Sequence, residues 1–167
     1  MNSAEVEGGI WVIPGSRYKT KLDHAIPLTD AFRELIGGKP AECRHNSWFV
    51  FSTTNGVRPF SGFSKAKRAI AKIRKETGRE PVSRWTLHDL RRTGRSLMSR
   101  AKVPGDHAER VLGHVIGGVR ETYDRYEYLE EKQQALTRLS NLLHEIINQA
   151  APSLRATVEV PGELAVA

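Results

Sequence analysis

Cysteine and long apolar runs are what this sequence lacks most clearly. Its single cysteine, Cys43, cannot form an internal disulfide, and one cysteine cannot build a zinc finger. No apolar run is long enough to cross a bilayer, and the acidic, glycine-containing N-terminus does not resemble a signal peptide. Glycine-rich phosphate loops and internal repeats are also missing. These absences argue against disulfide-rich, zinc-finger and membrane-spanning proteins and favour a soluble protein of a reducing compartment.

The charge balance is strongly basic. Lysine and arginine together number 26 against 19 for aspartate and glutamate, which gives a net charge of +7 and a pI near 9.8. A basic surface favours a polyanionic partner and salt-sensitive binding, although a high pI is weak evidence when it stands alone. The chain has 167 residues, of which 39% are hydrophobic, and this is enough for one domain with a single core.

The first part of the chain predicts a β-hairpin followed by a short helix. Ile10–Pro14 and Ala25–Leu28 have the composition of strands, and the basic loop Arg17–Lys21 forms a cationic tip between them. Thr29–Asp30 then offers an N-cap for a helix that continues through Leu35.

The next two segments are patterned differently. The apolar run Trp48–Phe51 predicts a third strand or a buried extended segment. From Ser61 to Lys75, apolar residues at helical spacing predict a helix with one packed side and one basic side. The basic side is a candidate DNA-binding surface, although such stripes are more often solvated faces. The packed side consists of Phe63, Ala66, Ile70 and Ile73, and the DNA-binding candidates on the other side are Lys65, Arg68 and Lys72.

A second helix is predicted from about Thr86. Its polar face brings His88, Arg91 and Arg95 together, and Arg95 is a further candidate for DNA binding. His88 and Arg91 are neighbours on this face because they lie one helical turn apart. The apolar stripe of the same helix consists of Leu87, Leu90, Leu97 and Met98.

The remainder predicts a short helix, a long helix and a tail. The short helix follows Pro104 and ends at Leu112, and Gly113 is a C-terminal stop that leaves His114 just beyond it. A long amphipathic helix covers about residues 119–148, and residues 150–167 read as a mobile tail. The expected fold class is therefore α+β, mainly helical with a small antiparallel sheet.

The chemistry of the chain is carried by His88, Arg91, His114 and Tyr123. Negative charge increases on the non-bridging oxygens of a phosphodiester as a nucleophile adds, so a catalyst without metal needs fixed donors directed at those oxygens. The guanidinium and the imidazoles are such donors. Tyr123 could then attack phosphorus and hold the cut strand as a phosphotyrosine ester, a reaction that needs no cofactor or metal ion.

Each catalytic candidate also has an ordinary structural interpretation. A single tyrosine on a helix is usually a packing residue, and Tyr126, followed by Tyr128, is the most plausible competitor of Tyr123. His88 could be a polar residue of a first helical turn, and His114 a loop histidine. The remaining histidines are interpreted as surface or structural residues, and they are His24, His45, His107 and His144.

The order and spacing of these residues resemble the tyrosine recombinase, or phage integrase, family, in particular the integrases of prophages and genomic islands. The matching motifs are Leu-His-Asp-Leu-Arg-Arg-Thr at 87–93, Leu-Gly-His at 112–114 and Val-Arg-Glu-Thr-Tyr-Asp-Arg at 119–125. The family also places a catalytic lysine eight residues before the proline of an Ile/Val-Pro-Leu strand, and Lys19 stands in this relation to Pro27. The resemblance covers roughly residues 9–147.

The resemblance implies a role for each matched residue. Lys19 would be the general acid that protonates the leaving 5′ oxygen, delivered by the mobile tip of the hairpin. Arg91 would clamp the scissile phosphate, and His88 and His114 would assist by hydrogen bonding and proton transfer. Tyr123 would be the nucleophile. Residues 1–149 would then form a partial catalytic domain that acts on double-stranded DNA as a homo-oligomer, a tetramer in the family, in the cytoplasm and at the nucleoid.

One part of the family pattern is not found. The family has a second phosphate-clamping arginine in a Thr-Gly-x-Arg-x-x-Glu-like helix before the lysine hairpin, and this sequence begins close to the hairpin. The similar run Thr77–Glu80 follows Lys19 instead of preceding it, so we do not assign it this role. Loss of one such donor costs about 10²- to 10³-fold in rate, which makes strand transfer by these 167 residues alone doubtful.

Three interpretations of the sequence remain open. The chain is the catalytic part of a site-specific recombinase whose missing arginine comes from sequence upstream, or it is a non-catalytic remnant that binds DNA or another protomer. A third and weaker interpretation, a helical nucleic-acid-binding protein unrelated to recombination, does not explain the order of the motifs.

Overall fold

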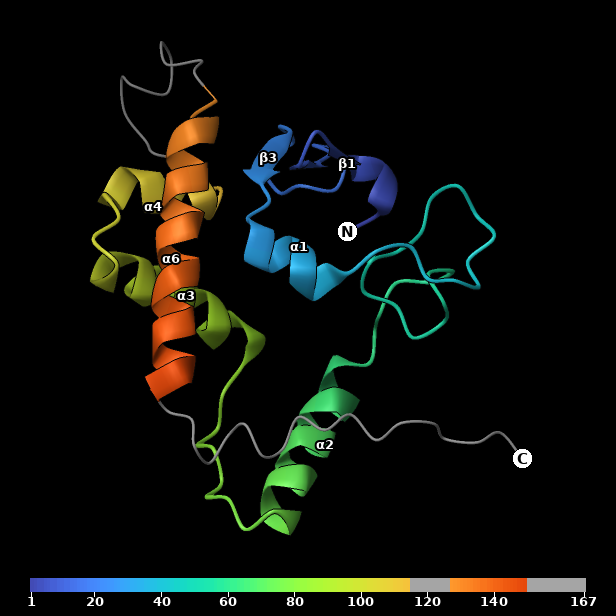
Figure 1. Cartoon of the computed structure of the whole chain (residues 1–167), viewed down its shortest axis with the longest axis vertical. Helices are drawn as coiled ribbons and strands as arrows, with labels where there is room; N and C mark the ends of the chain where they lie inside the picture. The colour runs from blue at the N-terminus through green and yellow to red at the C-terminus, as the bar shows by residue number, and fades with distance from the viewer. Residues whose placement is uncertain (115–126, 150–167) are drawn as a thin grey trace.

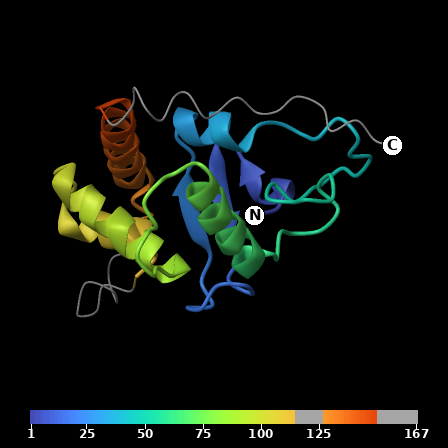
Figure 2. The same ribbon diagram turned by 90° about the horizontal axis from the view of Figure 1, so that it is seen from below.

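The computed structural model describes residues 1–114 and 127–149, which form a small antiparallel sheet and a set of helices (Figure 1). The sheet and helix α1 come from the N-terminal part of the chain. Helices α3, α4 and α6 gather on one side of the sheet in both views (Figures 1 and 2). The predicted fold class, α+β with mainly helical structure, is confirmed.

The sheet has three strands in the order β1-β2-β3, with β1 at Val6–Glu7, β2 at Ile10–Ile13 and β3 at His24–Pro27. Strands β2 and β3 pair antiparallel, so the predicted hairpin is confirmed. The sequence did not predict β1, because two residues are too few to show strand periodicity. It follows directly on the 3-10 helix η1 at Ser3–Glu5.

The prediction for Trp48–Phe51 was wrong, because this segment is neither a strand of the sheet nor buried. A single bridge joins Phe49 to Asn2. The amide of Phe49 donates to Gly56 O (2.9 Å), and Phe51 O accepts from the amide of Phe60 (2.8 Å), so these backbone groups pair within the 49–60 segment. Phe51 is 50% exposed.

Helix α1, Asp30–Ile36, begins as predicted. The hydroxyl of Thr29 accepts a hydrogen bond from the amide of Phe32 (3.3 Å), so Thr29, and not Asp30, is the N-cap. The helix ends at Gly37, whose amide donates to Arg33 O.

The hydrophobic core lies between α3 (Leu87–Arg100), α4 (Gly105–Val111) and α6 (Leu129–Gln149). Helix α3 starts with a reciprocal capping box between Thr86 and Asp89, which satisfies amides of its first turn. The buried core residues are Met98, Val103, Ala108 and Ala135. Because α6 contacts α3, α4 and strand β3, it holds the end of α4 beside the hairpin.

Helix α2, Phe63–Glu76, forms close to its predicted bounds, but the expectation that its apolar side is packed was wrong. Within residues 63–76 no side chain is buried, and Phe63, Ile70 and Ile73 are 49%, 47% and 57% exposed. Figure 1 shows α2 standing apart from α3, α4 and α6. Periodicity specifies that a helix has an apolar side, whereas burial requires a second element against that side.

The apolar stripe of α3 is covered only toward its C-terminal end. Met98 is 1% exposed, whereas Leu87 and Leu90 are 49% and 57% exposed. The start of the predicted long helix, and the predicted tail at 150–167, lie outside the described residues. Among residues 1–114 and 127–149, no helix is long and apolar enough to span a membrane, and no group of acidic, histidine and cysteine side chains is arranged to hold a metal ion.

Candidate active site

His114 is held at a fixed position by the way helix α4 ends. Gly113 adopts a positive φ of 63°, its amide donates to Arg110 O (3.1 Å), and the amide of His114 donates to Glu109 O (2.9 Å). This pair of bonds is a Schellman motif, in which the first residue beyond the helix takes the left-handed conformation that glycine tolerates best. The Leu-Gly-His sequence therefore turns the chain sharply and places His114 directly after the helix.

The side chain of Glu109 fixes the imidazole of His114. One carboxylate oxygen bonds to His114 Nδ1, and the other accepts a hydrogen bond from Arg95 Nε at 2.6 Å. Hydrogen bonds from Arg95 and then His114 lower the pKa of Glu109, although partial burial opposes them. Glu109 is therefore ionised at neutral pH and orients the imidazole through its Nδ1.

Arg91 reaches the same place from helix α3. Its half-buried guanidinium donates to Leu112 O, at the C-terminal end of α4. His88 lies one turn earlier in the first turn of α3, and its side chain is exposed. Arg91 and His88 therefore come from one helix, as predicted, and Arg91 is tied to the segment that carries His114.

The hairpin loop that carries Lys19 is folded and docks on the end of α4. Turn hydrogen bonds join the amide of Arg17 to Pro14 O, that of Tyr18 to Gly15 O and that of Lys21 to Tyr18 O. The Tyr18 hydroxyl is within hydrogen-bond distance of the carbonyls of Gly113 (3.1 Å) and Leu112 (3.4 Å). Lys19 is exposed and next in sequence to this anchor.

His24 supports the same contact from the start of strand β3. Its ring stacks on that of Tyr18 with 5.0 Å between centroids, and its Nε2 donates to Val111 O (3.2 Å). Burial lowers the pKa of His24, while the bond to Val111 opposes this shift and the positive charges of Lys132 and Arg91 reinforce it. His24 is thus a neutral imidazole at neutral pH, and of the two predicted roles, surface or structural, its burial and contacts fit the structural one.

A small cavity of about 170 Å³ lies beside this junction. Side chains of the hairpin, α4 and α6 line it, among them Tyr18, His24, Arg110, His114 and Lys132. Lys132 is largely buried, and its ammonium donates to Ala25 O (3.0 Å), which connects α6 to β3. Burial lowers the pKa of Lys132, and the nearby Glu127 carboxylate opposes this shift.

The structure thus brings three predicted catalytic elements to one place. The Lys19 loop, Arg91 and His114 converge on residues 112–114, with His88 on the adjacent turn of α3. Tyr123 lies outside the described residues, and so does its competitor Tyr126.

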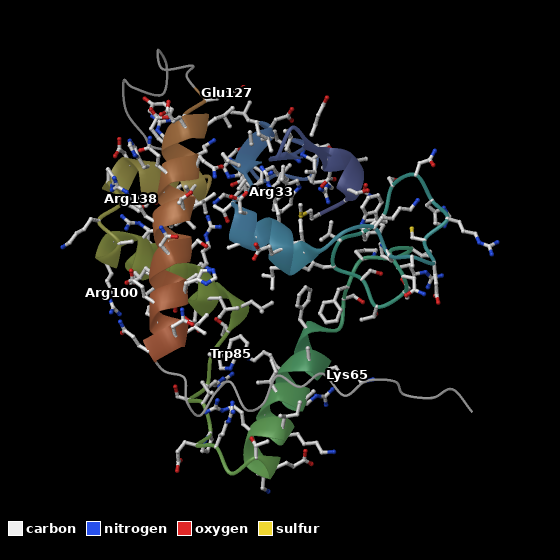
Figure 3. All side chains as sticks on the ribbon, in the orientation of Figure 1. Arg33, Lys65, Trp85, Arg100, Glu127 and Arg138 are labelled. Carbon is white, nitrogen blue, oxygen red and sulfur yellow. The ribbon has the colours of Figure 1, made fainter. Side chains whose placement is uncertain are left out.

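The predicted DNA-binding residues fall into two groups. Lys65, Arg68 and Lys72 are all exposed on α2, and Lys72 pairs with Glu76 at 3.6 Å. Figure 3 shows Lys65 on α2 apart from α3, α4 and α6, with Trp85 on the segment between α2 and α3. Arg95 instead bonds Glu109 and the Ser99 hydroxyl (2.6 Å), so in this structure it orders α3 and α4. DNA binding by these residues stays a prediction.

Sequence reasoning did not identify the supporting residues Tyr18, Glu109 and Lys132. An acidic residue on the last turns before the Leu-Gly-His motif was a usable signal for Glu109, because helical spacing places it near the residue after the helix. Tyr18 and Lys132 left no such signal, since their partners lie 95 and 107 residues away in the sequence.

Comparisons with known proteins agree with this geometry. A family model described as the phage integrase family matches residues 1–130. An integrase of Shigella phage Sf6 is 25% identical over 144 residues, which cover 86% of this chain and 36% of that protein. The prophage integrase IntS of Escherichia coli matches with the same identity and coverage. The chain therefore spans about a third of the length of these curated relatives, and no solved structure matches it.

Both relatives are integrases by name, and the matched residues 1–130 include the candidates Lys19, His88, Arg91 and His114. Site-specific DNA recombination and integration is the function of that family as a whole. This chain belongs to the phage integrase family of tyrosine recombinases.

Proposed function

We propose that the chain is the catalytic part of a site-specific recombinase that cuts DNA through a 3′-phosphotyrosine intermediate. The observation that carries the proposal is the convergence of the Lys19 loop, Arg91 and His114 on residues 112–114. Tyr18 of the loop and the two residues whose carbonyls it contacts, Leu112 and Gly113, are 94 and 95 residues apart in the sequence. Basic and imidazole groups gathered in this way suit a phosphodiester whose charge rises during attack.

In the proposed step, the phenol oxygen of Tyr123 forms a bond to phosphorus while the bond from phosphorus to the 5′ oxygen breaks. The phenol proton passes to an imidazole of the site, and the 5′ oxygen receives a proton from the Lys19 ammonium. The strand is then held as a phosphotyrosine ester. Rejoining is the same step in reverse, with a 5′ hydroxyl as nucleophile and the phenol as leaving group.

Arg91, His88 and His114 stabilise the charge that develops on the phosphate. Arg91 supplies a planar guanidinium suited to two non-bridging oxygens, and the imidazoles supply single hydrogen bonds. The Glu109 carboxylate keeps His114 in one orientation and favours a proton on its Nδ1. Removal of one such donor typically lowers the rate about 10²- to 10³-fold.

The proposed chemistry also needs the family's second phosphate-clamping arginine, which has no match among these 167 residues. The relatives are much longer than the matched region, which covers 36% of each of them. Strand exchange between two DNA sites also requires several active sites at once, so we include assembly into a tetramer on paired sites in the proposal.

Trapping of the covalent complex tests the nucleophile. The full-length protein is incubated with a nicked duplex whose cut releases a short fragment, and the adduct is detected by its reduced mobility under denaturing conditions. Tyr123→Phe should abolish the adduct, and the matched control Tyr126→Phe should leave it. An adduct that persists in Tyr123→Phe, or disappears only in Tyr126→Phe, contradicts the assignment.

Non-catalytic DNA binding is the second candidate function, and one observation favours it. Lys65, Arg68 and Lys72 are all exposed on a helix of which no residue in 63–76 is buried. Changing the three residues to alanine should weaken duplex binding and reduce its salt dependence. A matched change of Arg44, Arg58 and Arg100, also exposed, removes the same charge elsewhere. Equal effects of the two triple variants would show that only net charge matters.

A further inference from the structure

We propose that Tyr18 is a positioning residue whose hydroxyl docks the Lys19 loop onto the end of helix α4, and so delivers the general acid to the scissile phosphate. The docking itself is independent of any reaction, whereas its catalytic consequence rests on the proposed function. Tyr18 would not touch the reacting atoms, whereas Lys19 would.

The loop is ordered internally but needs an anchor to the helices. At its base, Gly15 donates its amide to the Asp23 carboxylate (2.7 Å), and turn bonds at Arg17, Tyr18 and Lys21 fold the residues between. These bonds fix the shape of the loop without fixing its place over α4. The Tyr18 hydroxyl supplies that link through the carbonyls of Gly113 and Leu112.

Gly113 leaves room for the phenol of Tyr18 because it has no side chain. A Cβ atom built on Gly113 would lie 1.7 Å from the Tyr18 hydroxyl oxygen, 2.8 Å from its ring carbon Cζ and 3.1 Å from His24 Nε2. The residue before His114 must therefore be glycine for two reasons, its positive φ and the close approach of Tyr18. Gly113 thus determines both the turn that leads to His114 and the place where Tyr18 docks the Lys19 loop.

Tyr18 docks on the same short segment that the candidate phosphate-binding groups share. Residues 112–114 receive Tyr18 from the hairpin and Arg91 from α3, and they carry His114. Docking of Tyr18 therefore places the loop next to the groups that would bind the phosphate. When the P–O5′ bond breaks, Lys19 Nζ gives its proton to the departing oxygen, and this transfer requires the docked loop.

The first experiment measures docking without DNA. Arg17, Lys19 and Lys21 make the loop a substrate for trypsin, so the rate of cleavage at these residues in the native full-length protein reports how often the loop leaves α4. Tyr18→Phe should raise that rate about fivefold to tenfold, in line with the loss of one hydrogen bond. Thr77→Val, which removes a hydroxyl that donates to Ile73 O (2.9 Å) at the end of α2, should not change it. An unchanged rate in Tyr18→Phe overturns the docking.

The second experiment separates positioning from folding. On a normal nicked substrate, Tyr18→Phe should slow formation of the Tyr123 adduct about fivefold to tenfold, and Lys19→Ala should slow it more. On a substrate with sulfur in place of the bridging 5′ oxygen, the leaving thiolate needs no proton. Both variants should then approach the wild-type rate.

The outcomes of the second experiment are distinct. A Tyr18→Phe defect that persists on the sulfur substrate indicates a general structural role and overturns the inference, as does a wild-type rate on the oxygen substrate. If the wild-type protein forms no adduct on either substrate, the proposed function fails, and the trypsin measurement still decides whether Tyr18 docks the loop.

Discussion

Helices α2 and α3 are each 14 residues long and equally amphipathic, yet only α3 contributes to the hydrophobic core. The difference lies in the segment that comes after each helix in the chain. After α3, a short connection returns the chain as α4, and α6 then covers both helices. After α2, the chain leaves through an irregular segment in which Trp85 sits against Lys67, with the ammonium 4.5 Å from the ring centroid.

The comparison separates two properties that are often treated as one. An apolar side makes a helix able to pack, and it packs only where other elements lie against that side. In α3 the side chains beyond the core are also held by polar contacts to α4, such as Arg95 with Glu109. Of the catalytic candidates, Arg91 and His114 are tied to the end of α4, whereas the candidate DNA-binding stripe lies on the exposed helix α2.

The largest expected effect is that of removing a core side chain from α3. Met98 is 1% exposed, and Met98→Ala should lower the free energy of unfolding by about 2–5 kcal/mol through lost burial and the cavity left behind. Urea denaturation followed by far-UV circular dichroism measures the change. A loss below about 1 kcal/mol would mean that α3 is no better packed than α2 and would remove the contrast.

The second prediction concerns the end of α4. Gly113→Ala forces a side chain into the left-handed region and against the Tyr18 ring, so it should cost about 1–3 kcal/mol and release the loop to trypsin. Gly94→Ala is a matched control, because a Cβ on Gly94, in the middle of α3, meets nothing within 4 Å. It should instead stabilise the protein by up to about 1 kcal/mol through helix propensity. Equal effects of the two substitutions would contradict the proposal that Tyr18 docks against Gly113.

Much of this packed region could be predicted from the sequence. The hairpin, the cap at Thr29, the helix start at Thr86 and the stop at Gly113 depend on neighbouring residues, and each was predicted. The convergence of Arg91 and His114 could be expected only from the family resemblance, because no local pattern relates a residue of one helix to the end of another.

The features that the sequence did not predict depend on distant partners. Tyr18 docks on backbone carbonyl groups, which every residue possesses. The residue types at 112 and 113 therefore do not predict a contact with a tyrosine. The exposure of Ile70 and the irregular path of Trp48–Phe51 have the same origin. In both cases composition favours burial or a strand, and the elements needed for it are not adjacent among the described residues.

The third prediction concerns pH and the stacked pair of His24 and Tyr18. Since the pKa of His24 is lowered in the folded chain, the unfolded chain takes up a proton first as pH falls below the usual value of 6.5. Stability should therefore be complete above pH 6.5 and decrease below it, because a charged ring would be buried and would also face Lys132 and Arg91.

Thermal unfolding between about pH 7.5 and about pH 5.5, a range that spans the usual pKa of histidine, measures this loss, which should be smaller than that of Gly113→Ala. His24→Gln should remove the part of the pH dependence that comes from this group, since the amide does not titrate. A wild-type protein and a His24→Gln variant with the same pH dependence would show that the imidazole is not the titrating group.

The smallest expected effect belongs to α2. Ile73 is 57% exposed, so Ile73→Ala removes little buried area, and the better helix propensity of alanine offsets part of that loss. The free energy of unfolding should change by no more than about 0.5 kcal/mol. A loss above about 1.5 kcal/mol would mean that the apolar side of α2 is covered in solution, by a second copy or by another segment of the polypeptide. Comparison of the effect at two protein concentrations separates these cases, because only cover by a second copy depends on concentration.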